Sequence, residues 1–154
     1  MLEDVSISES MELNGYEYVD FDVAKSQVHL PDYKTDVKHG ELILNLYDGK
    51  KQLFKPMSFK IHAPSEHTLN GKHFDAELQL LHHYKGTDQQ LGAVIAIFFD
   101  TTANEGKQNP FLETIFEVFD SPSIQGRIML KTFLQTVDFS IYWNYDGSLT
   151  QPPC

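Results

Sequence analysis

The sequence predicts a mainly β protein built from antiparallel strand pairs. In residues 41–47 apolar and polar side chains alternate, which is typical of a strand with one buried face. The dipeptide Asp48-Gly49 follows as a turn signal, and the chain then turns back into residues 51–62, where alternation resumes. Together these segments predict an antiparallel hairpin.

A second unit of strand, turn and strand is expected over residues 58–83. Its turn signal is Asn70-Gly71, a dipeptide favoured in two-residue hairpin turns. Side chains two residues apart on a strand share one face, so Lys60 and His62 are expected to point the same way. Most of the candidate metal ligands and carboxylates of the chain gather in this unit.

Residues 92–100 form a continuous apolar run with β-branched side chains, which predicts a strand buried on both faces in the middle of a wide sheet. One helix is expected from residue 109 onward, because Asn109 can cap it and Pro110 suits its first position. The helix should pack through one apolar stripe, made of Phe111, Leu112, Ile115, Phe116 and Phe119.

The composition excludes some classes of partner. The chain has 154 residues, enough for one domain, and carries a net charge of -10 with only 12 Lys and Arg. Nucleic acids and anionic membranes reward clustered positive charge, so neither is expected as a partner. No apolar run is long enough to span a bilayer. Residues 1–24 predict an acidic, weakly structured arm without the features of a signal peptide, and the localisation stays unassigned.

Four stretches of the chain carry a more specific pattern. They read SEHTLNGKHFDAEL at 65–78, GAVIAIFF at 92–99, NPFL at 109–112 and YWNYDGSLTQPPC at 142–154. From about Glu41 onward, their order and spacing resemble the α-type carbonic anhydrases. The resemblance implies a large, twisted, mostly antiparallel sheet with a few short helices. It also implies a zinc site on the sheet, at the base of a conical pocket.

The resemblance further implies a mechanism. In the family, two histidines of an H-x-H motif and a third on the neighbouring strand bind zinc, and water takes the fourth position. The pKa of that water falls to about 7, so hydroxide is available to attack carbon dioxide. A threonine and a glutamate orient the hydroxide. By the family motifs these two positions match Thr150 and Glu66 in this chain.

The ligand positions depart from the family pattern. Where the family has H-x-H, this chain reads Lys60-Ile61-His62, and where it has E-L-H, this chain reads Glu77-Leu78-Gln79. A lysine ammonium cannot coordinate a metal, and an amide is a poor ligand for zinc. One imidazole of three is not expected to hold the ion. We therefore expect no cofactor, with Glu77 left at the floor of the former site.

Other residues near that position allow alternatives. His67 and His82 match structural, hydrogen-bonded histidines of the family, although a displaced metal site built from nearby histidines is conceivable. Lys60 could replace the charge of the zinc ion by pairing with Glu77 or Glu66, since unpaired buried carboxylates are costly. Alternatively, Lys60 could extend into an open, solvated cleft.

The resemblance also assigns a pocket wall and a disulfide-type position. The wall residues are Leu81, Val94, Leu149 and Gln151. Cys154 matches a cysteine that pairs near the N-terminus in secreted members of the family. Residues 1–154 are thus expected to be a single, partial domain, truncated at both ends. A sheet cut in this way would expose strand edges, so association with other protein chains or a larger assembly is expected.

Two functions follow. The favoured one is a catalytically inactive carbonic anhydrase-like module that acts as a structural or interaction subunit, without zinc. The alternative is an active, zinc-dependent carbonate dehydratase with an atypical metal site.

Overall fold

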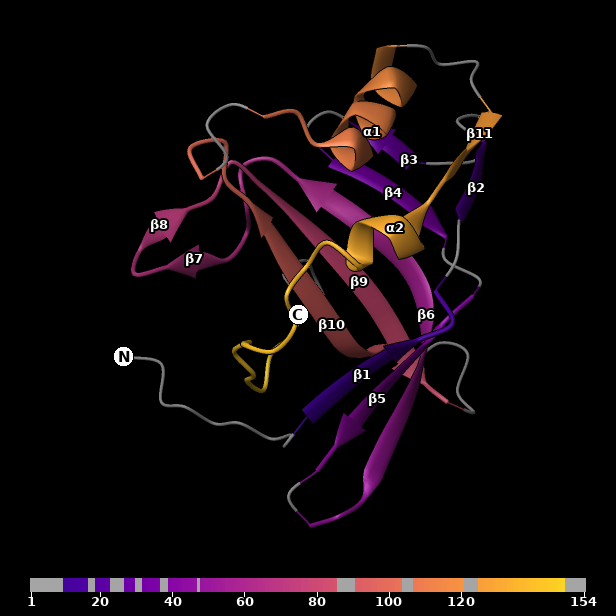
Figure 1. Cartoon of the computed structure of the whole chain (residues 1–154), viewed down its shortest axis with the longest axis vertical. Coiled ribbons are helices and arrows are strands. Elements are labelled where there is room, and N and C mark those ends of the chain that lie inside the picture. Colours follow the sequence, from indigo (N-terminus) through magenta and orange to yellow (C-terminus); the bar gives the residue numbers. More distant parts are fainter. Residues whose placement is uncertain are drawn as a thin grey trace.

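A twisted, antiparallel sheet with two short helices on one face forms the body of the molecule (Figure 1). The computed structural model describes residues 10–16, 19–22, 27–29, 32–36, 39–46, 48–85, 91–103, 107–120 and 125–148. Within these ranges, seven strands make up the main sheet: β1 (Ser10–Asn14), β3 (Gln27–His29), β4 (Asp32–Asp36), β5 (Glu41–Asn45), β6 (Lys51–His62), β9 (Ala76–Tyr84) and β10 (Leu91–Phe99). The predicted mainly β, antiparallel architecture is confirmed.

The long strand β6 is the centre of the sheet. Its first part pairs with β5 and its last part with β4, while its other edge pairs with β9. The predicted hairpin around Asp48-Gly49 is the β5–β6 pair, and Gly49 adopts the positive φ of 78° that such a turn favours. The burial alternates along β5, as the apolar and polar alternation predicts.

A register shift divides β6 into two parts. Pro56 lies opposite His82 of β9, whereas Ser58 lies opposite Leu81, so Met57 forms a bulge. Beyond the bulge, Phe59 and Ile61 face the helices and form part of the apolar core. We call this side of the sheet the core face. The opposite side carries Lys60 and His62 and is called the site face.

The turn at Asn70-Gly71 belongs to a separate ribbon, which differs from the expectation. Strands β7 (Thr68–Leu69) and β8 (Lys72–His73) form this two-stranded ribbon, which projects away from the main sheet in Figure 1. The strands β6 and β9 that flank it do pair as predicted. Asn70 and Gly71 have φ values of 53° and 77°, as a tight turn requires, but they close the ribbon rather than the main strand pair.

Among the residues that the structure describes, strand β10 lies at an edge of the main sheet and not in its middle, so that expectation was wrong for this part of the chain. Among the described residues β10 pairs only with β9, and Val94 on its site face is 42% exposed. Its core-face side chains Ile95, Ile97 and Phe99 pack in the main core. An unbroken apolar run therefore marks one buried face here, because an apolar sequence alone does not report what covers the other face.

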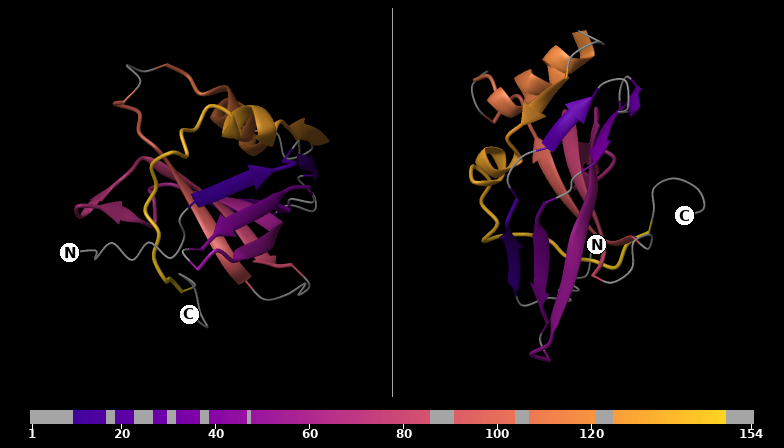
Figure 2. Two further views of the ribbon diagram at one scale, coloured as in Figure 1. Left: turned by 60° about the horizontal axis from the view of Figure 1, so that its bottom comes forward. Right: turned by 90° about the vertical axis from the view of Figure 1, so that its right-hand side faces the viewer.

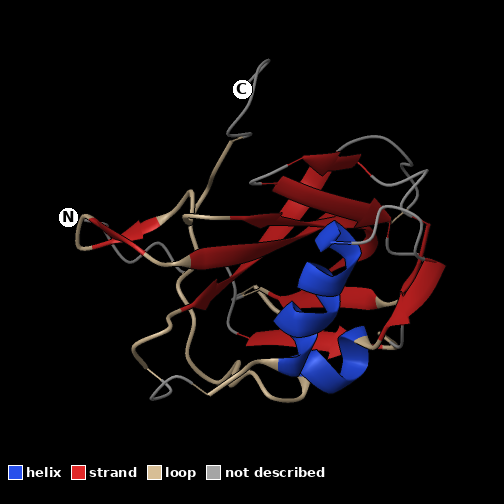
Figure 3. Ribbon diagram, turned by 90° about the horizontal axis from the view of Figure 1, so that it is seen from above, coloured by secondary structure: helices blue, strands red, loops and turns tan. Residues whose placement is uncertain are grey.

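Two helices cover the core face, as Figures 2 and 3 show. They are α1 (Pro110–Asp120) and α2 (Leu130–Leu134). The Oδ1 atom of Asn109 accepts hydrogen bonds from the backbone N–H groups of Phe111 and Leu112, at 3.0 and 3.4 Å, so the predicted cap is confirmed. Ile115 is fully buried, but Phe116 is 58% exposed because it lies at the outer edge of the apolar stripe. No described helix is long and apolar enough to cross a membrane.

The predicted arm contributes strands where it is described. β1 pairs with β5 at one edge of the main sheet, and β2 (Val19–Asp22) pairs with β11 (Gln125–Ile128). This differs from a weakly structured segment, because Leu13 packs against the apolar core and anchors β1. Residues 1–9, 17–18 and 23–24 of the predicted arm lie outside the described residues.

Tyr16 follows β1, and its side chain packs in the core against His82. The Tyr16 hydroxyl and His82 Nε2 are hydrogen-bonded, and both side chains are buried. Burial lowers the pKa of His82 to about 4 and raises the pKa of Tyr16, because each charged form would lose its hydration. His82 is thus a neutral, structural histidine, as the resemblance implied.

Candidate functional site

The three predicted ligand positions meet on the site face. Lys60 of β6 lies directly opposite Gln79 of β9, and His62 lies opposite Glu77. Three of these side chains are almost inaccessible, since Glu77, Gln79 and His62 are 0%, 5% and 5% exposed. The sequence therefore placed this group of residues correctly on two neighbouring strands. Glu66 reaches it from the loop that follows β6.

The amide of Gln79 joins two carboxylates. Its Nε2 group donates hydrogen bonds to Glu66 Oε2 and to Glu77 Oε1, each at 2.9 Å. An amide NH2 has two hydrogens, and these two bonds use both of them. One amide group thereby links Glu66 and Glu77.

Glu77 is held by a second group of donors. The His67 backbone N–H donates to Glu77 Oε2 at 2.9 Å, and His67 Nδ1 lies 2.6 Å from Glu77 Oε1. The bond to Glu77 raises the pKa of His67, against the opposing effect of its own burial. Burial alone would raise the pKa of Glu77, but the hydrogen bonds from His67 and Gln79 outweigh it and lower that pKa. His67 and Glu77 thus form a partly buried hydrogen-bonded pair, which is an ion pair when His67 is protonated.

The same histidine connects the site to the last described segment. His67 Nε2 and the Tyr145 hydroxyl are hydrogen-bonded, and the two rings meet edge to face with centroids 5.9 Å apart. Burial and the nearby charge of Glu77 raise the pKa of Tyr145. The resemblance implied a hydrogen-bonded histidine at position 67, and the bonds of His67 to Glu77 and Tyr145 agree with it. Tyr145 was not predicted as part of the site, although it lies in the YWNY stretch.

The observed contacts of Glu66 and Glu77 concern the hypothesis that Lys60 replaces the charge of the zinc ion. Glu77 is bonded to His67 and Gln79, and Glu66 Oε2 lies 3.7 Å from His62 Nε2 as well as in contact with Gln79. The His67 imidazole thus gives Glu77 a hydrogen-bonding partner that the charge-replacement hypothesis did not include. Replacement of the zinc charge by Lys60 stays a prediction.

The predicted pocket wall is described in part. Leu81 and Val94 lie opposite each other on β9 and β10, next to the row that contains Gln79. Leu81 is buried, and Val94 is exposed. The other predicted positions, Leu149, Thr150, Gln151 and Cys154, lie outside the described residues. Their roles as wall, orienting threonine and disulfide-type cysteine stay predictions.

Comparison with known proteins decides the family. The model of the eukaryotic-type carbonic anhydrase family matches residues 7–154. The chain belongs to this carbonic anhydrase family. A carbonic anhydrase of Klebsiella pneumoniae is 36% identical over 97 residues, which cover 62% of this chain and 37% of that protein. Alpha carbonic anhydrase 8 of Arabidopsis thaliana is 29% identical over 148 residues, covering 87% of this chain and 36% of that protein.

Solved structures agree with the assignment. A dioscorin complexed with ascorbate has a TM-score of 0.70 and 29% identity, covering 99% of this chain and 59% of that one. A hyperthermostable carbonic anhydrase from a hydrothermal vent chimney has a TM-score of 0.62 and 30% identity, covering 95% and 60%. The chain thus spans little more than a third of the curated carbonic anhydrases and about three fifths of the solved structures.

Proposed function

We propose that this carbonic anhydrase-family chain is a non-catalytic module that acts as a structural or interaction subunit. The observation that carries the proposal is the position of Gln79, whose amide is bonded to Glu66 and Glu77. At this position the resemblance implies an imidazole ligand. Here the side-chain NH2 group donates to both carboxylates, and an amide is a poorer zinc ligand than an imidazole.

The residues at the implied ligand positions do not fit a zinc ion. Zinc sites in proteins use imidazole, thiolate or carboxylate ligands, and catalytic ones usually have three. Lys60 has no lone pair when charged, and Gln79 is engaged with two carboxylates. Among the described residues, no group of three or more His, Cys, Asp and Glu side chains is placed to hold a metal ion. We derive no catalytic step for this site.

The proposed role of this site is structural. Glu77, Gln79 and His67 connect β9, the loop after β6 and the segment that contains Tyr145 through hydrogen bonds that range from buried to exposed. Buried polar groups that are fully hydrogen-bonded favour one arrangement of the chain. In this proposal the network does what the bound ion would otherwise do for the fold: it joins neighbouring segments on the site face.

The proposed interaction role is supported by exposed apolar side chains near the end of the described chain. Ile141 and Trp143 are 78% and 63% exposed, and they alternate with Tyr142 and Asn144 in a segment without regular secondary structure. Large exposed apolar and aromatic side chains are typical of protein–protein contacts. The described edge of β10 adds unpaired backbone groups. We propose another protein chain as the partner.

Zinc content and hydratase activity test the first half of the proposal. The purified chain, exposed to excess zinc and then desalted, is expected to carry far less than one zinc per chain and to leave the rate of carbon dioxide hydration at the buffer value. An active carbonic anhydrase treated in parallel is the control. One chelator-sensitive zinc per chain together with hydration activity would instead establish the dehydratase alternative.

A matched pair of variants tests the interaction role. Ile141→Ser with Trp143→Ser should abolish co-purification of the native partner while leaving the thermal unfolding of the module unchanged, because both side chains are exposed. Tyr84→Ser, at a 38% exposed position on the far end of β9, is the control and should retain the partner. Equal recovery of the partner with the double variant and the control would contradict this assignment of the surface.

A further inference from the structure

A second feature, a cavity, lies on the core face and is independent of the proposed function. It has a volume of about 350 Å³ and lies between the end of β1 and helix α2. This volume is at the lower end of the range for small-molecule pockets, about 300–1,000 Å³. The residues that line it are Met11, Leu13, Gly15, Tyr16, Lys131, Leu134, Gln135 and Phe139.

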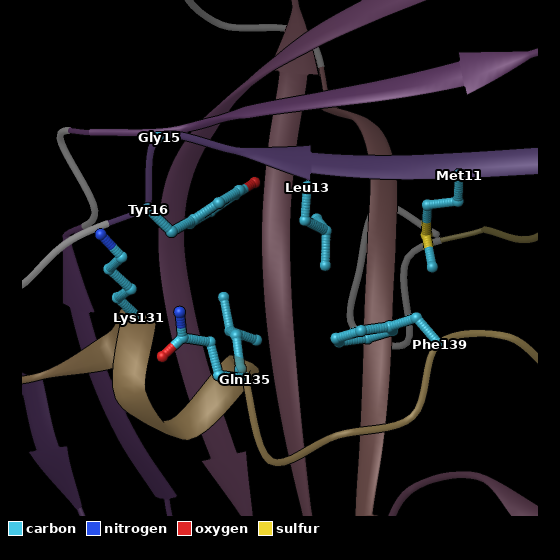
Figure 4. Close-up of a pocket in the computed structure, with 8 residues that line it drawn as sticks. Met11, Leu13, Gly15, Tyr16, Lys131, Gln135 and Phe139 are labelled. Atoms are coloured by element: carbon cyan, nitrogen blue, oxygen red, sulfur yellow. The ribbon is translucent and has the colours of Figure 1, made fainter.

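The cavity has an apolar end and a polar end, as Figure 4 shows. Met11 and Phe139 face each other at one end, with Leu13 beside them. These three side chains are partly buried, and Leu13 and Phe139 pack against the main core. Apolar lining of this kind favours an alkyl or aryl group, since its burial removes apolar surface from water.

The polar end is formed by α2 and Tyr16. Lys131 and Gln135 are four residues apart, so they share one side of the helical turn, and both side chains are exposed. In Figure 4 the Lys131 ammonium extends toward Tyr16. The Tyr16 hydroxyl is bonded to His82, so Tyr16 offers its ring to the cavity rather than a free donor. An ammonium and an amide NH2 are both donors, and together they match a carboxylate.

We propose that this cavity binds a small amphipathic carboxylate, such as a medium-chain fatty acid. The alkyl chain lies between Met11, Leu13 and Phe139, and the carboxylate accepts hydrogen bonds from Lys131 and Gln135. A neutral ligand would leave the ammonium without a counter-charge from the ligand. A short carboxylate such as acetate would leave the apolar end unfilled. Recognition thus requires both parts of the molecule.

Titration calorimetry of the full chain with octanoate tests the proposal, with 1-octanol and acetate as matched probes. Saturable one-to-one binding of octanoate is expected, with weaker binding of octanol and none of acetate. Lys131→Gln should weaken octanoate binding about tenfold, as loss of one charge-assisted hydrogen bond implies. Lys72→Gln removes the same charge from the exposed ribbon strand β8 and should leave the affinity unchanged.

A second variant tests the apolar end of the cavity independently of Lys131. Met11→Trp fills the apolar end and should abolish octanoate binding, provided that circular dichroism shows a folded chain. If that variant does not fold, the exposed Lys131→Gln still gives the answer. Absence of saturable octanoate binding would overturn the proposal. Equal affinities for octanoate and octanol, or no effect of Lys131→Gln, would overturn the assignment of a carboxylate.

Discussion

Replacing Lys60→His and Gln79→His together is expected to create a zinc site in a chain for which we propose no stoichiometric zinc. The register places residue 60 directly opposite residue 79, and His62 follows on the same face of β6. The double variant would therefore direct three imidazoles to one point, with Glu77 and Glu66 beside them to orient the rings. Metal analysis after dialysis should find about one zinc per chain.

The single variants are the controls for this result. Lys60→His alone and Gln79→His alone provide two imidazoles each, so they should bind zinc much more weakly than the double variant. Addition of His62→Ala to the double variant should remove the ion again. If the double variant is folded but takes up no zinc, the shape of the site has been lost along with its ligands, and the inferred ligand geometry is wrong.

Glu77→Ala is expected to lower the free energy of unfolding by roughly 3–4 kcal/mol, the range for breaking a buried, hydrogen-bonded charge pair. The side chain is completely buried and accepts hydrogen bonds from His67 and Gln79. Its loss leaves the donors of both residues without that acceptor. Urea unfolding measures the change. Glu12→Ala removes a carboxylate that is 46% exposed and should leave the free energy of unfolding nearly unchanged.

The contribution of Glu77 to the free energy of unfolding is expected to depend on pH within a defined range. The pKa of Glu77 is lowered in the folded chain, so its contribution is present above its ordinary value of 4.5 and is lost as the pH falls through the lower folded value. The pKa of His67 is raised, so its contribution is complete below 6.5 and is lost as the pH rises through the higher folded value. The difference between the wild type and Glu77→Ala should be largest between pH 4.5 and 6.5. A difference that is constant from pH 3 to 9 would contradict the ion pair.

The sequence predicted the strands themselves better than the position of each strand within the sheet. Alternation set the faces of β5 and the last part of β6, and Asn109 with Pro110 set the start of α1. The location of β10 at the described edge of the sheet could not be predicted, because an apolar run carries no information about its neighbours. The Asn70-Gly71 turn was recognised, but its strands were misassigned, since turn chemistry fixes a bend and not the length of the strands around it.

The sequence predicted which residues lie together at the candidate site, but not which hydrogen bonds they make. The family motifs and strand parity brought Lys60, His62 and Gln79 together, and the register confirms that arrangement. The bonds of Gln79 to both carboxylates depend on side-chain rotamers, which no sequence pattern specifies. The contact between His67 and Tyr145 joins residues 78 positions apart and therefore required the three-dimensional fold.

The bulge at Met57 determines which residues of β6 can reach the site at all. Without that extra residue, all even-numbered positions of β6 would share one face, and Lys60 and His62 would lie with Pro56 against the helices. The single inserted residue instead reverses which face of the sheet each following side chain occupies. Pro56 before the bulge and Phe59 and Ile61 after it can therefore share the core face, while Lys60 and His62 lie on the site face. The same inserted residue that keeps both parts of β6 packed on the core face thus also supplies the two β6 positions of the site.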